Sequence, residues 1–314
     1  MNIEENLEHD IPLAQFTSYR IGGPAKHFIE VDTPEGIVEA IRWAKKNNEK
    51  YFILGGGSNI LIADKGYNGL IIKNSYQYIY RDGTEMTCSS GLSLARACLS
   101  ASRHAFSGLE WAAGIPGTIG GAVNGNAGAY GQSMADIVKS VKVYLVDEDK
   151  IVEYTNEKCG FAYRYSNFKL GNQVILEVVL QLKKGKTEEI LQKMQEYVAN
   201  RVSKHPKFPS AGSVFKNVPL SELTSVDPDV IEHARSDGAI RNDKLSAAWL
   251  IESIYMKGRW VGGARISEVH SNFITNESLK ASAEDIIVLM SLIKQKVRVT
   301  YGIQLKEEIT YLDY

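Results

Sequence analysis

The chain has 314 residues, of which 44% are hydrophobic and 23% are charged, and its formal net charge is -1. This composition is typical of a soluble globular protein, and the length favours about two domains. A net charge near zero excludes a global electrostatic attraction to nucleic acid or to an anionic membrane. The first ten residues, MNIEENLEHD, contain neither a basic segment nor an apolar run, so we expect a cytoplasmic protein without membrane insertion. Cys88, Cys98 and Cys159 are odd in number and lack CxxC spacing, which predicts small buried side chains and neither disulfides nor a metal site.

A strand, helix and strand are predicted near the N-terminus. Residues 27–31 form a short strand, and Thr33-Pro34-Glu35 then begins a helix, because it combines a capping hydroxyl, a proline at the first helical position and a carboxylate. This helix ends near Asn47 and has one apolar face, formed by Ile37, Val38, Ile41 and Ala44. Residues 51–54 form a buried strand that leads directly into a glycine loop, GGGSN, at 55–59.

Two glycine-rich segments indicate a site for a long anion. The first, at 55–59, lacks the Lys-Ser/Thr of a P-loop and has Ile60 where GxGxxG requires its third glycine. The second, GLEWAAGIPGTIGGAVNGNAGAYG at 108–131, holds seven of the chain's 27 glycines after residue 113. Glycine costs about 1 kcal/mol in a helix or strand, so this density favours backbone N–H groups that approach a ligand, although a loop packed tightly against its own domain is the alternative.

The rest of the chain predicts a mixed α+β fold. Strands are expected at 69–73, 85–89 and, with period-two alternation, within 138–182, and helices at 93–104 and 247–253. A long helix beginning at Thr187 is predicted to bury Ile190, Leu191, Met194, Val198 and Val202, and to end before Pro206. Residues 218–246 are polar and predict irregular structure. Ser282 caps a last helix with core positions Ile286, Leu289, Ile293 and Val297, which ends at Gly302 and leads into a strand over 303–312.

Five motifs in this order resemble the UDP-N-acetylenolpyruvoylglucosamine reductase family: GGGSNIL, GIPGTIGGAVNGNAGAYG, FAYRYSNFK, SAGSVFKN and LKEEITYL. The resemblance runs from about residue 17 to the C-terminus. It implies an FAD-binding domain of the PCMH (vanillyl-alcohol-oxidase) type over 17–185, with subdomains at about 17–74 and 75–185. A substrate-binding domain is implied over 186–314, with its last strand returning towards the active site. The implied reaction uses NADPH and bound FAD to reduce UDP-N-acetylenolpyruvoylglucosamine to UDP-N-acetylmuramate, a peptidoglycan precursor.

The resemblance also implies three catalytic residues. Ser213 is expected to donate a proton, while Arg164 and Glu308 stabilise the enolate-like intermediate, and a guanidinium suits a carboxylate because it can bind both oxygens. Alternation along the last strand leaves the acid open. Glu307 shares a face with Ile303, Leu305, Ile309 and Tyr311, whereas Glu308 lies on the polar face, so the pattern singles out Glu307 and the family spacing selects Glu308.

Cofactor and substrate contacts are expected from the same resemblance. The residues implied for FAD are Gly55, Gly56, Gly57, Ser58, Asn59, Gly114, Gly117, Thr118, Gly121, Asn126 and Ile175. Those implied for the UDP-sugar are Tyr163, Lys204 and Asn217. Neither glycine loop contains His or Cys, so we expect non-covalent flavin. Only about ten residues separate Arg164 from Val174, which indicates the family type without an added tyrosine loop. The alternatives are a flavin-dependent oxidase or dehydrogenase acting on an alcohol, and a flavin-binding protein without catalytic activity.

Overall fold

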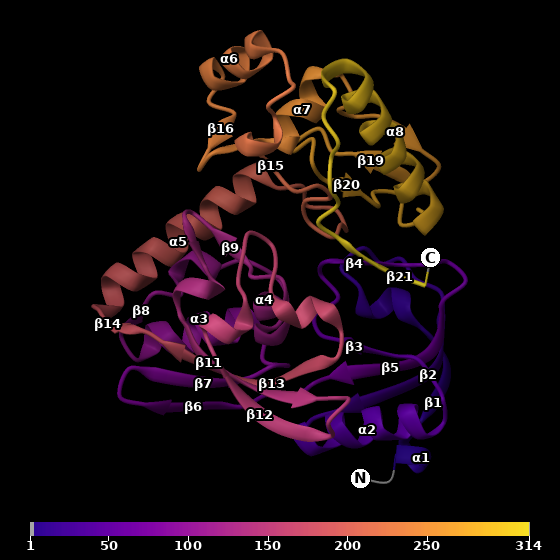
Figure 1. Cartoon of the computed structure of the whole chain (residues 1–314), viewed down its shortest axis with the longest axis vertical. Helices are drawn as coiled ribbons and strands as arrows, with labels where there is room; N and C mark the ends of the chain where they lie inside the picture. Colours follow the sequence, from indigo (N-terminus) through magenta and orange to yellow (C-terminus); the bar gives the residue numbers. More distant parts are fainter. Residues whose placement is uncertain (1–2, 314) are drawn as a thin grey trace. The chain divides into compact units, whose positions relative to one another are not determined.

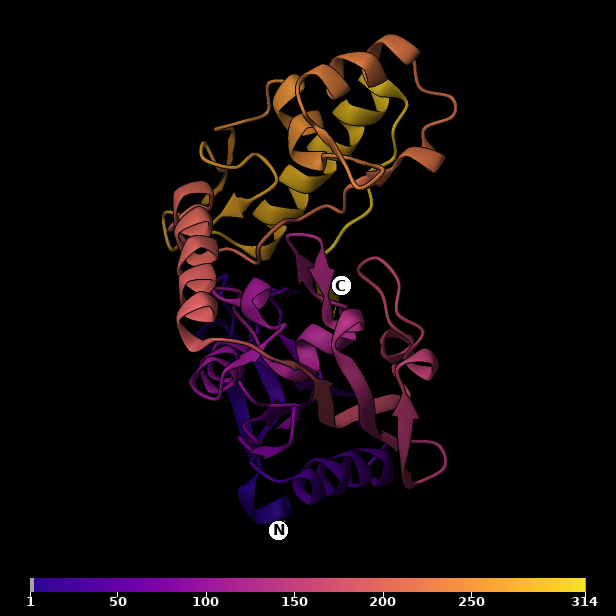
Figure 2. The same ribbon diagram turned by 90° about the vertical axis from the view of Figure 1, so that its left-hand side faces the viewer.

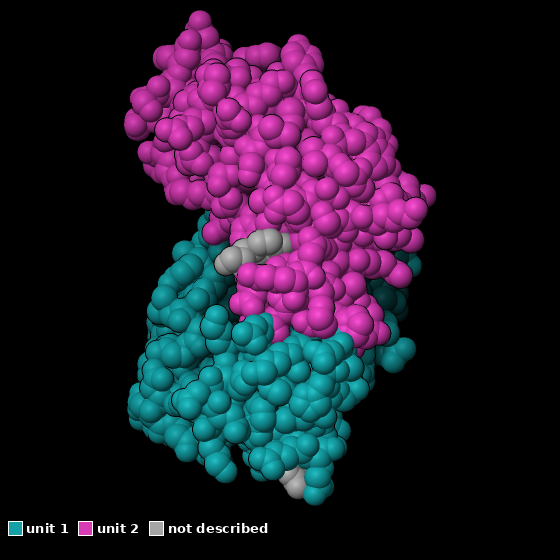
Figure 3. All heavy atoms as spheres, turned by 90° about the vertical axis from the view of Figure 1, so that its right-hand side faces the viewer, with its two compact units in different colours: residues 1–11, 25–56, 68–203 teal, residues 12–24, 57–67, 204–314 magenta. Residues whose placement is uncertain are grey.

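The computed structural model describes residues 3–313, which form two compact units (Figure 3). Unit 1 comprises Met1–Ile11, Ala25–Gly56 and Asn68–Ser203, and unit 2 comprises Pro12–Pro24, Gly57–Tyr67 and Lys204–Tyr314. These units differ from the predicted domains, 17–185 and 186–314. The helix after residue 186 packs with unit 1, and two N-terminal segments pack with the C-terminal third of the chain.

A four-stranded sheet and one helix form the N-terminal part of unit 1. The sheet has the order β1 (Glu8–Pro12), β2 (Pro24–Val31), β5 (Tyr67–Asn74) and β3 (Tyr51–Leu54), and β3 and β5 are parallel. The predicted helix is α2 (Pro34–Lys46), and the Thr33 hydroxyl accepts a hydrogen bond from Gly36 N at 3.0 Å. Its predicted apolar face is buried against β2 and β5. The expected strand, helix and strand are therefore confirmed. A short helix, α1 (Ile3–Asn6), precedes them.

An antiparallel five-stranded sheet forms the second part of unit 1 (Figure 1). Its order is β12 (Lys150–Thr155), β11 (Val138–Leu145), β13 (Gln173–Gln181), β7 (Glu85–Ser89) and β6 (Ile79–Asp82). Helices α3 (Leu94–Arg103) and α4 (Ile119–Asn124) pack against it. Val143 pairs with Ile175 whereas Lys142 pairs with Glu177, so Leu176 is an extra residue in β13. This bulge shifts the side-chain alternation, and Ile175 and Val178 consequently reach the same core.

Two short antiparallel strand pairs join loops of unit 1. Helix α5 (Thr187–Lys204) lies at the edge of this unit (Figure 2). The pairs are β8 (Phe106–Ser107) with β14 (Lys183–Lys184), and β9 (Gly128–Ala129) with β10 (Gln132–Ser133). The predicted core stripe of α5 is correct for Ile190 and Met194 and wrong for its other three residues. Only Ile190 is fully buried, while Leu191 and Val198 are 38% exposed and Val202 is 63% exposed. The face turned to the core carries Ile190, Met194, Tyr197 and Arg201, and the guanidinium of Arg201 binds two backbone carbonyl oxygens of unit 1.

Unit 2 is built around α8 (Ala283–Tyr301) and α7 (Ala247–Ser253). All four predicted core positions of α8 are buried, Ser282 forms a capping box with Asp285, and Gly302 ends the helix with φ 70°. Two three-stranded sheets complete the unit. They are β15 (Val218–Pro219), β17 (Lys244–Leu245) and β16 (Ile240–Arg241), and β18 (Trp260–Val261), β19 (Ala264–Ile266) and β20 (Ile274–Thr275).

Two predictions for unit 2 are corrected by the structure. Residues 218–246 are not irregular, because they contain α6 (Pro228–Ser236) besides the first of these sheets. The helix begins at an Asp227 carboxylate that accepts from Asp229 N at 3.0 Å. The predicted strand over 303–312 is much shorter, since only β21 (Thr310–Leu312) forms a ladder, parallel to β4 (Ile60–Ile62).

No helix within residues 3–313 is both long and apolar enough to cross a lipid bilayer. The three cysteines are buried, as predicted. Burial raises the pKa of the thiols of Cys88 and Cys98 to about 12 and that of Cys159 to about 11, so each is a protonated, unreactive side chain at neutral pH.

Candidate active site

The two glycine loops come together within unit 1. Gly55 and Gly56 follow β3, and Gly117 and Thr118 precede α4. A Cβ atom on Gly55 would lie 2.7 Å from Thr118 Oγ1, and one on Gly56 would lie 2.7 Å from Gly117 Cα. Both distances are shorter than packed atoms allow, so glycine is required for this approach. The sequence expectation that two glycine loops serve one site therefore has geometric support.

Lys73 is a feature of this site that the sequence reasoning missed. Its Nζ donates to the Gly55 carbonyl at 2.5 Å from the neighbouring strand β5, where Lys73 pairs with Leu54. Burial lowers the pKa of this lysine. A lysine at the end of the apolar run LII was the available signal. It places a cation beside the loop predicted to hold a diphosphate.

The second half of the first loop belongs to unit 2. Gly57 has φ 60°, and a Cβ there would overlap the carbonyl oxygen of Phe16. Asn59 is linked to the C-terminal segment twice: its Nδ2 donates to Glu308 O at 3.1 Å, and its carbonyl accepts from Thr310 N at 3.0 Å. The ladder between β4 and β21 continues this pairing. The predicted FAD loop is thus joined through hydrogen bonds to the segment that carries the predicted acid.

Ser213 lies on a segment that is paired with the same C-terminal residues. Phe215 and Glu307 form an antiparallel bridge, Glu308 N donates to Val214 O at 2.8 Å, and Lys216 N donates to Lys306 O at 2.9 Å. Ser213 itself is half-buried and bridges to Phe273 on its other side. The backbone therefore holds the predicted proton donor and the predicted acid on neighbouring segments of unit 2.

The two candidate acids have different surroundings. Glu307 Oε1 accepts a hydrogen bond from Lys294 Nζ at 2.6 Å, so its carboxylate is ion-paired with helix α8. Glu308 is the residue whose backbone N–H and C=O reach both the Ser213 segment and Asn59. The ion pair explains an acid at position 307 on structural grounds. The selection of Glu308 as the functional acid stays a prediction.

Arg164 lies within unit 1 on a tight loop. Ala162 and Tyr165 exchange backbone hydrogen bonds of 3.0 and 3.1 Å, which leaves Tyr163 and Arg164 at the tip. Arg164 has φ 54°, a left-handed conformation that is uncommon outside glycine and marks functional sites more often than others. Its Nη1 donates to Gly128 O at 3.2 Å, and its guanidinium lies 5.4 Å from the centroid of the Tyr163 ring. The predicted catalytic arginine therefore contacts the second glycine-rich segment.

Arg201 of α5 is a second cation at that segment, and sequence reasoning did not assign it. Its Nε and Nη2 donate to the carbonyls of Ala113 and Trp111 at 3.1 Å each, directly before Gly114. Its guanidinium lies 5.3 Å from the Tyr130 ring centroid, and that ring stacks on Tyr197. Burial lowers the pKa of Arg201, and the positive charge of Arg164 acts in the same direction. No sequence signal separates it from the other cations that follow it in RVSKH.

Four other residues that were predicted to bind FAD or the UDP-sugar lie in different parts of the two units. Thr118 caps α4 by accepting from Gly121 N at 3.3 Å. Asn126 is buried, and its amide joins two loops of unit 1, donating to Ala162 O at 2.8 Å and accepting from Ala135 N at 3.0 Å. In unit 2, Lys204 is exposed at the end of α5, and Asn217 accepts from Ala247 N at 3.1 Å. No cluster of three or more His, Cys, Asp or Glu side chains that could hold a metal ion occurs among the residues described.

Comparison with known families agrees with this arrangement. Residues 25–155 match the family described as "FAD binding domain", and residues 184–312 match "UDP-N-acetylenolpyruvoylglucosamine reductase, C-terminal domain". With the α+β fold and the paired glycine loops, these matches define an FAD-dependent oxidoreductase. The expected fold class and cofactor are confirmed.

Full-length relatives identify the family. The UDP-N-acetylenolpyruvoylglucosamine reductase of Clostridioides difficile is 36% identical over 98% of this chain and 94% of its own length. That of Bacillus subtilis is 37% identical, over 95% and 91%. The crystal structure of the Thermus caldophilus reductase superposes with a TM-score of 0.76 at 31% identity, covering 98% of both chains. The chain belongs to the UDP-N-acetylenolpyruvoylglucosamine reductase family.

Proposed function

We propose that this chain reduces UDP-N-acetylenolpyruvoylglucosamine to UDP-N-acetylmuramate with NADPH as the electron source, and so serves peptidoglycan precursor synthesis. One observation carries the proposal beyond family membership. The main chain of Glu308 bonds at once to the Ser213 segment and to Asn59 of the first glycine loop. The predicted acid, proton donor and cofactor loop of unit 2 therefore share one hydrogen-bonded framework.

The residues present fit FAD. The backbone contact between Gly56 and Gly117 leaves no room for side chains, as a cradle of N–H groups around a diphosphate requires. The residues that would hold it are Gly55, Gly56, Gly57, Ser58, Asn59, Gly114, Gly117, Thr118, Gly121, Asn126 and Ile175. Bound FAD supplies the hydride. Because neither loop has His or Cys, the cofactor is bound without a covalent link.

Arg164 stabilises the charge that the reaction creates. Hydride addition to an enol ether that bears a carboxylate moves negative charge onto that carboxylate. A guanidinium remains protonated and can bind both carboxylate oxygens, so it lowers the barrier most if it is already oriented. The hydrogen bond from Arg164 to Gly128 and its contact with the Tyr163 ring support such preorganisation.

Ser213 completes the reaction by protonating the neighbouring carbon. A hydroxyl is a weak acid, so its alkoxide needs nearby positive charge, for which Lys216 on the same segment is a candidate. Glu308 lies at the substrate carboxylate and helps to stabilise the enolate-like intermediate. Tyr163, Lys204 and Asn217 contact the UDP-sugar, and the exposed ammonium of Lys204 suits a diphosphate.

Anaerobic stopped-flow measurements on Ser213→Ala test the proposal, with Ser278→Ala, an exposed serine of unit 2, as the control. NADPH is expected to bleach the flavin absorbance of both variants at the wild-type rate. Reoxidation by the enolpyruvyl substrate should slow by about 10²–10⁴-fold in Ser213→Ala alone, as loss of a general acid requires. Reoxidation of Ser213→Ala at the wild-type rate would refute the assigned role. Bleaching by an alcohol, or no turnover at all in the wild-type protein, would favour one of the two alternatives.

A further inference from the structure

Asn272 is a buried residue that binds the Ser213 segment with its side chain. It is 3% exposed and lies in unit 2, between β19 and β20. Its Oδ1 accepts from Phe215 N at 3.0 Å, and its Nδ2 donates to Phe215 O at 2.9 Å. Its own carbonyl accepts from Val214 N at 2.9 Å. One amide side chain thus satisfies the N–H and C=O of a single residue, as a paired strand would.

Residues 306–308 bond to one side of the strand-like segment 213–216, and the bonds to Asn272 hold its other side. In a strand, successive residues direct their backbone groups to opposite sides. Lys216 N and Val214 O bond to residues 306–308, whereas both backbone groups of Phe215 bond to Asn272. Val214 N also turns to Asn272, so the regular alternation is broken immediately after Ser213. The orientation of Ser213 is therefore set by its bridge to Phe273 and by the bonds of Asn272 to the two residues that follow.

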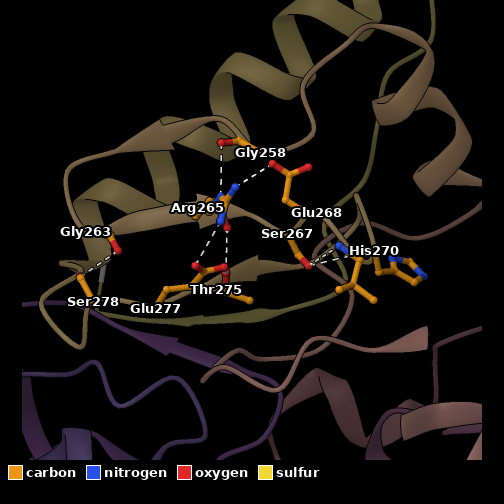
Figure 4. A network of polar contacts seen from close by, with 10 residues as sticks. Gly258, Gly263, Arg265, Ser267, Glu268, His270, Thr275, Glu277 and Ser278 are labelled. Atoms are coloured by element: carbon orange, nitrogen blue, oxygen red, sulfur yellow. Dashed lines mark hydrogen bonds and ion pairs between the residues drawn. The ribbon is translucent and has the colours of Figure 1, made fainter. Parts of the chain in front are cut away.

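The loop that carries Asn272 is held by its own hydrogen bonds (Figure 4). Ser267 N donates to Phe273 O at 2.9 Å. The Ser267 hydroxyl accepts from Val269 N and His270 N, as Figure 4 shows. His270 Nδ1 accepts from Asn272 N at 3.2 Å. The guanidinium of Arg265, on β19, binds Glu268 and Glu277. The backbone carbonyl of Arg265 accepts a hydrogen bond from the Thr275 hydroxyl on β20. Asn272 therefore projects from a rigid support.

The chemistry of the side chain restricts what can replace it. An amide offers a donor and an acceptor, whereas a carboxylate offers acceptors only and an alanine offers neither. Asn276, which directly follows β20, is a comparable buried asparagine of the same unit. It is 0% exposed, and its side chain also makes two hydrogen bonds to backbone groups, to Tyr19 O at 3.1 Å and from Ala281 N at 3.0 Å. Neither of these side-chain bonds is to the Ser213 segment. The bond from Asn276 N to Pro209 O, at 2.9 Å, is made by the backbone and is kept in an alanine variant.

From this geometry we infer that Asn272 is a positioning residue for the proton transfer, acting through the backbone of Val214 and Phe215 on Ser213. The inference rests on the proposed role of Ser213. In this role Asn272 touches neither substrate nor cofactor. Its contribution is confined to the step that delivers the proton, and a displacement of about 1 Å in a reacting group can cost on the order of 100-fold in rate.

The experiment compares Asn272→Ala, Asn272→Asp and the matched control Asn276→Ala in the full chain with FAD bound. Both alanine variants should lose thermal stability, because each removes two buried backbone hydrogen bonds. Only the Asn272 variants should slow reoxidation by the enolpyruvyl substrate, by about 10- to 100-fold for alanine. Bleaching of the flavin absorbance by NADPH, and the FAD dissociation constant, should stay within about twofold of wild type in all variants.

A second comparison separates positioning from a general loss of structure. If Asn272 acts through Ser213, Asn272→Ala should cause no further slowing of reoxidation in a Ser213→Ala background. A full additional loss there, or wild-type reoxidation by Asn272→Ala and Asn272→Asp while Ser213→Ala is slow, would overturn this inference and leave the proposed function standing. Wild-type reoxidation by Ser213→Ala would remove the proposed role of Ser213 and the inference with it. Should Asn272→Ala not fold, Asn272→Asp gives the same decision, because it retains the acceptor for Phe215 N.

Discussion

Replacing Gly56 with alanine tests whether the two glycine loops must touch. Gly56 does not have a positive φ, so alanine is compatible with its local backbone. The obstacle is the other loop, because the new Cβ would lie 2.7 Å from Gly117 Cα, whereas ordinary contacts begin at 3.4 Å. The loops must therefore separate by about 0.7 Å. Flexible side chains cannot absorb this shift, since the nearest three atoms all belong to the backbone of Gly117.

The expected loss is in FAD affinity. Overpacking of this size costs about 1–3 kcal/mol, which corresponds to an increase of about 5- to 150-fold in the dissociation constant if the cost falls on the bound state. Titration of the flavin-free protein with FAD, followed by flavin fluorescence, measures this directly. Gly125→Ala is the matched control, because its Cβ would meet its nearest neighbour, Gly121 O, at 3.5 Å. Wild-type FAD affinity in Gly56→Ala would refute the argument that close approach of the loops builds the site.

Three further predictions follow from unit 2. Glu307→Gln breaks an ion pair whose side chains are 29% and 31% exposed, so it should lower the free energy of unfolding by no more than about 1 kcal/mol and leave reoxidation intact. Glu308→Ala should slow reoxidation, because alanine offers the substrate carboxylate no hydrogen-bonding group. The reverse result in stopped flow would select Glu307. Burial, reinforced by the nearby charges of His205 and Lys257, lowers the pKa of His270 to about 4 in the folded protein. In the unfolded chain the pKa of this histidine is about 6.5. As the pH falls, the unfolded chain therefore binds the proton first. Stability from this group is complete above about pH 6.5 and is lost towards pH 4, and urea titrations of His270→Gln should show a shallower decline over that range; an unchanged decline would contradict this. Ser282→Ala removes the acceptor for Asp285 N at 3.0 Å and should cost about 1 kcal/mol in urea denaturation, and no loss would show that the cap is dispensable.

Local patterns predicted the elements whose stability depends on neighbours in sequence. The capping hydroxyls of Thr33 and Ser282 and the apolar faces of α2 and α8 are found where the sequence indicated. In α5 the helix was predicted correctly, but its buried face was predicted only in part. An apolar stripe cannot reveal that Arg201 turns inward to two carbonyl oxygens, since the value of that contact depends on where the segment before Gly114 lies.

Which segments belong to each unit depends on strand pairings between residues far apart in the sequence. β4 and β21 are separated by about 250 residues, and periodicity carries no information about partners at that range. Helix α6 was missed for a different reason. Asp227-Pro228-Asp229 is a helix start of the same kind as Thr33-Pro34-Glu35, but the apolar residues after it are too few to outweigh the polar composition. Among the site residues, motif order indicated the glycine loops, Ser213 and Glu308, while Lys73 and Asn272 become visible only through their hydrogen bonds.

The pairing of β21 with β4 has a consequence for biosynthesis. Ile62 pairs with Leu312, and a ribosome adding about 5–20 residues per second needs about 10–50 s to make the chain between them. During that interval the first glycine loop, which we propose binds the nucleotide, emerges without the strand that later holds Asn59. We therefore expect newly made chains to acquire flavin only after residues 310–312 have been added, and stop codons before Thr310 to yield colourless protein.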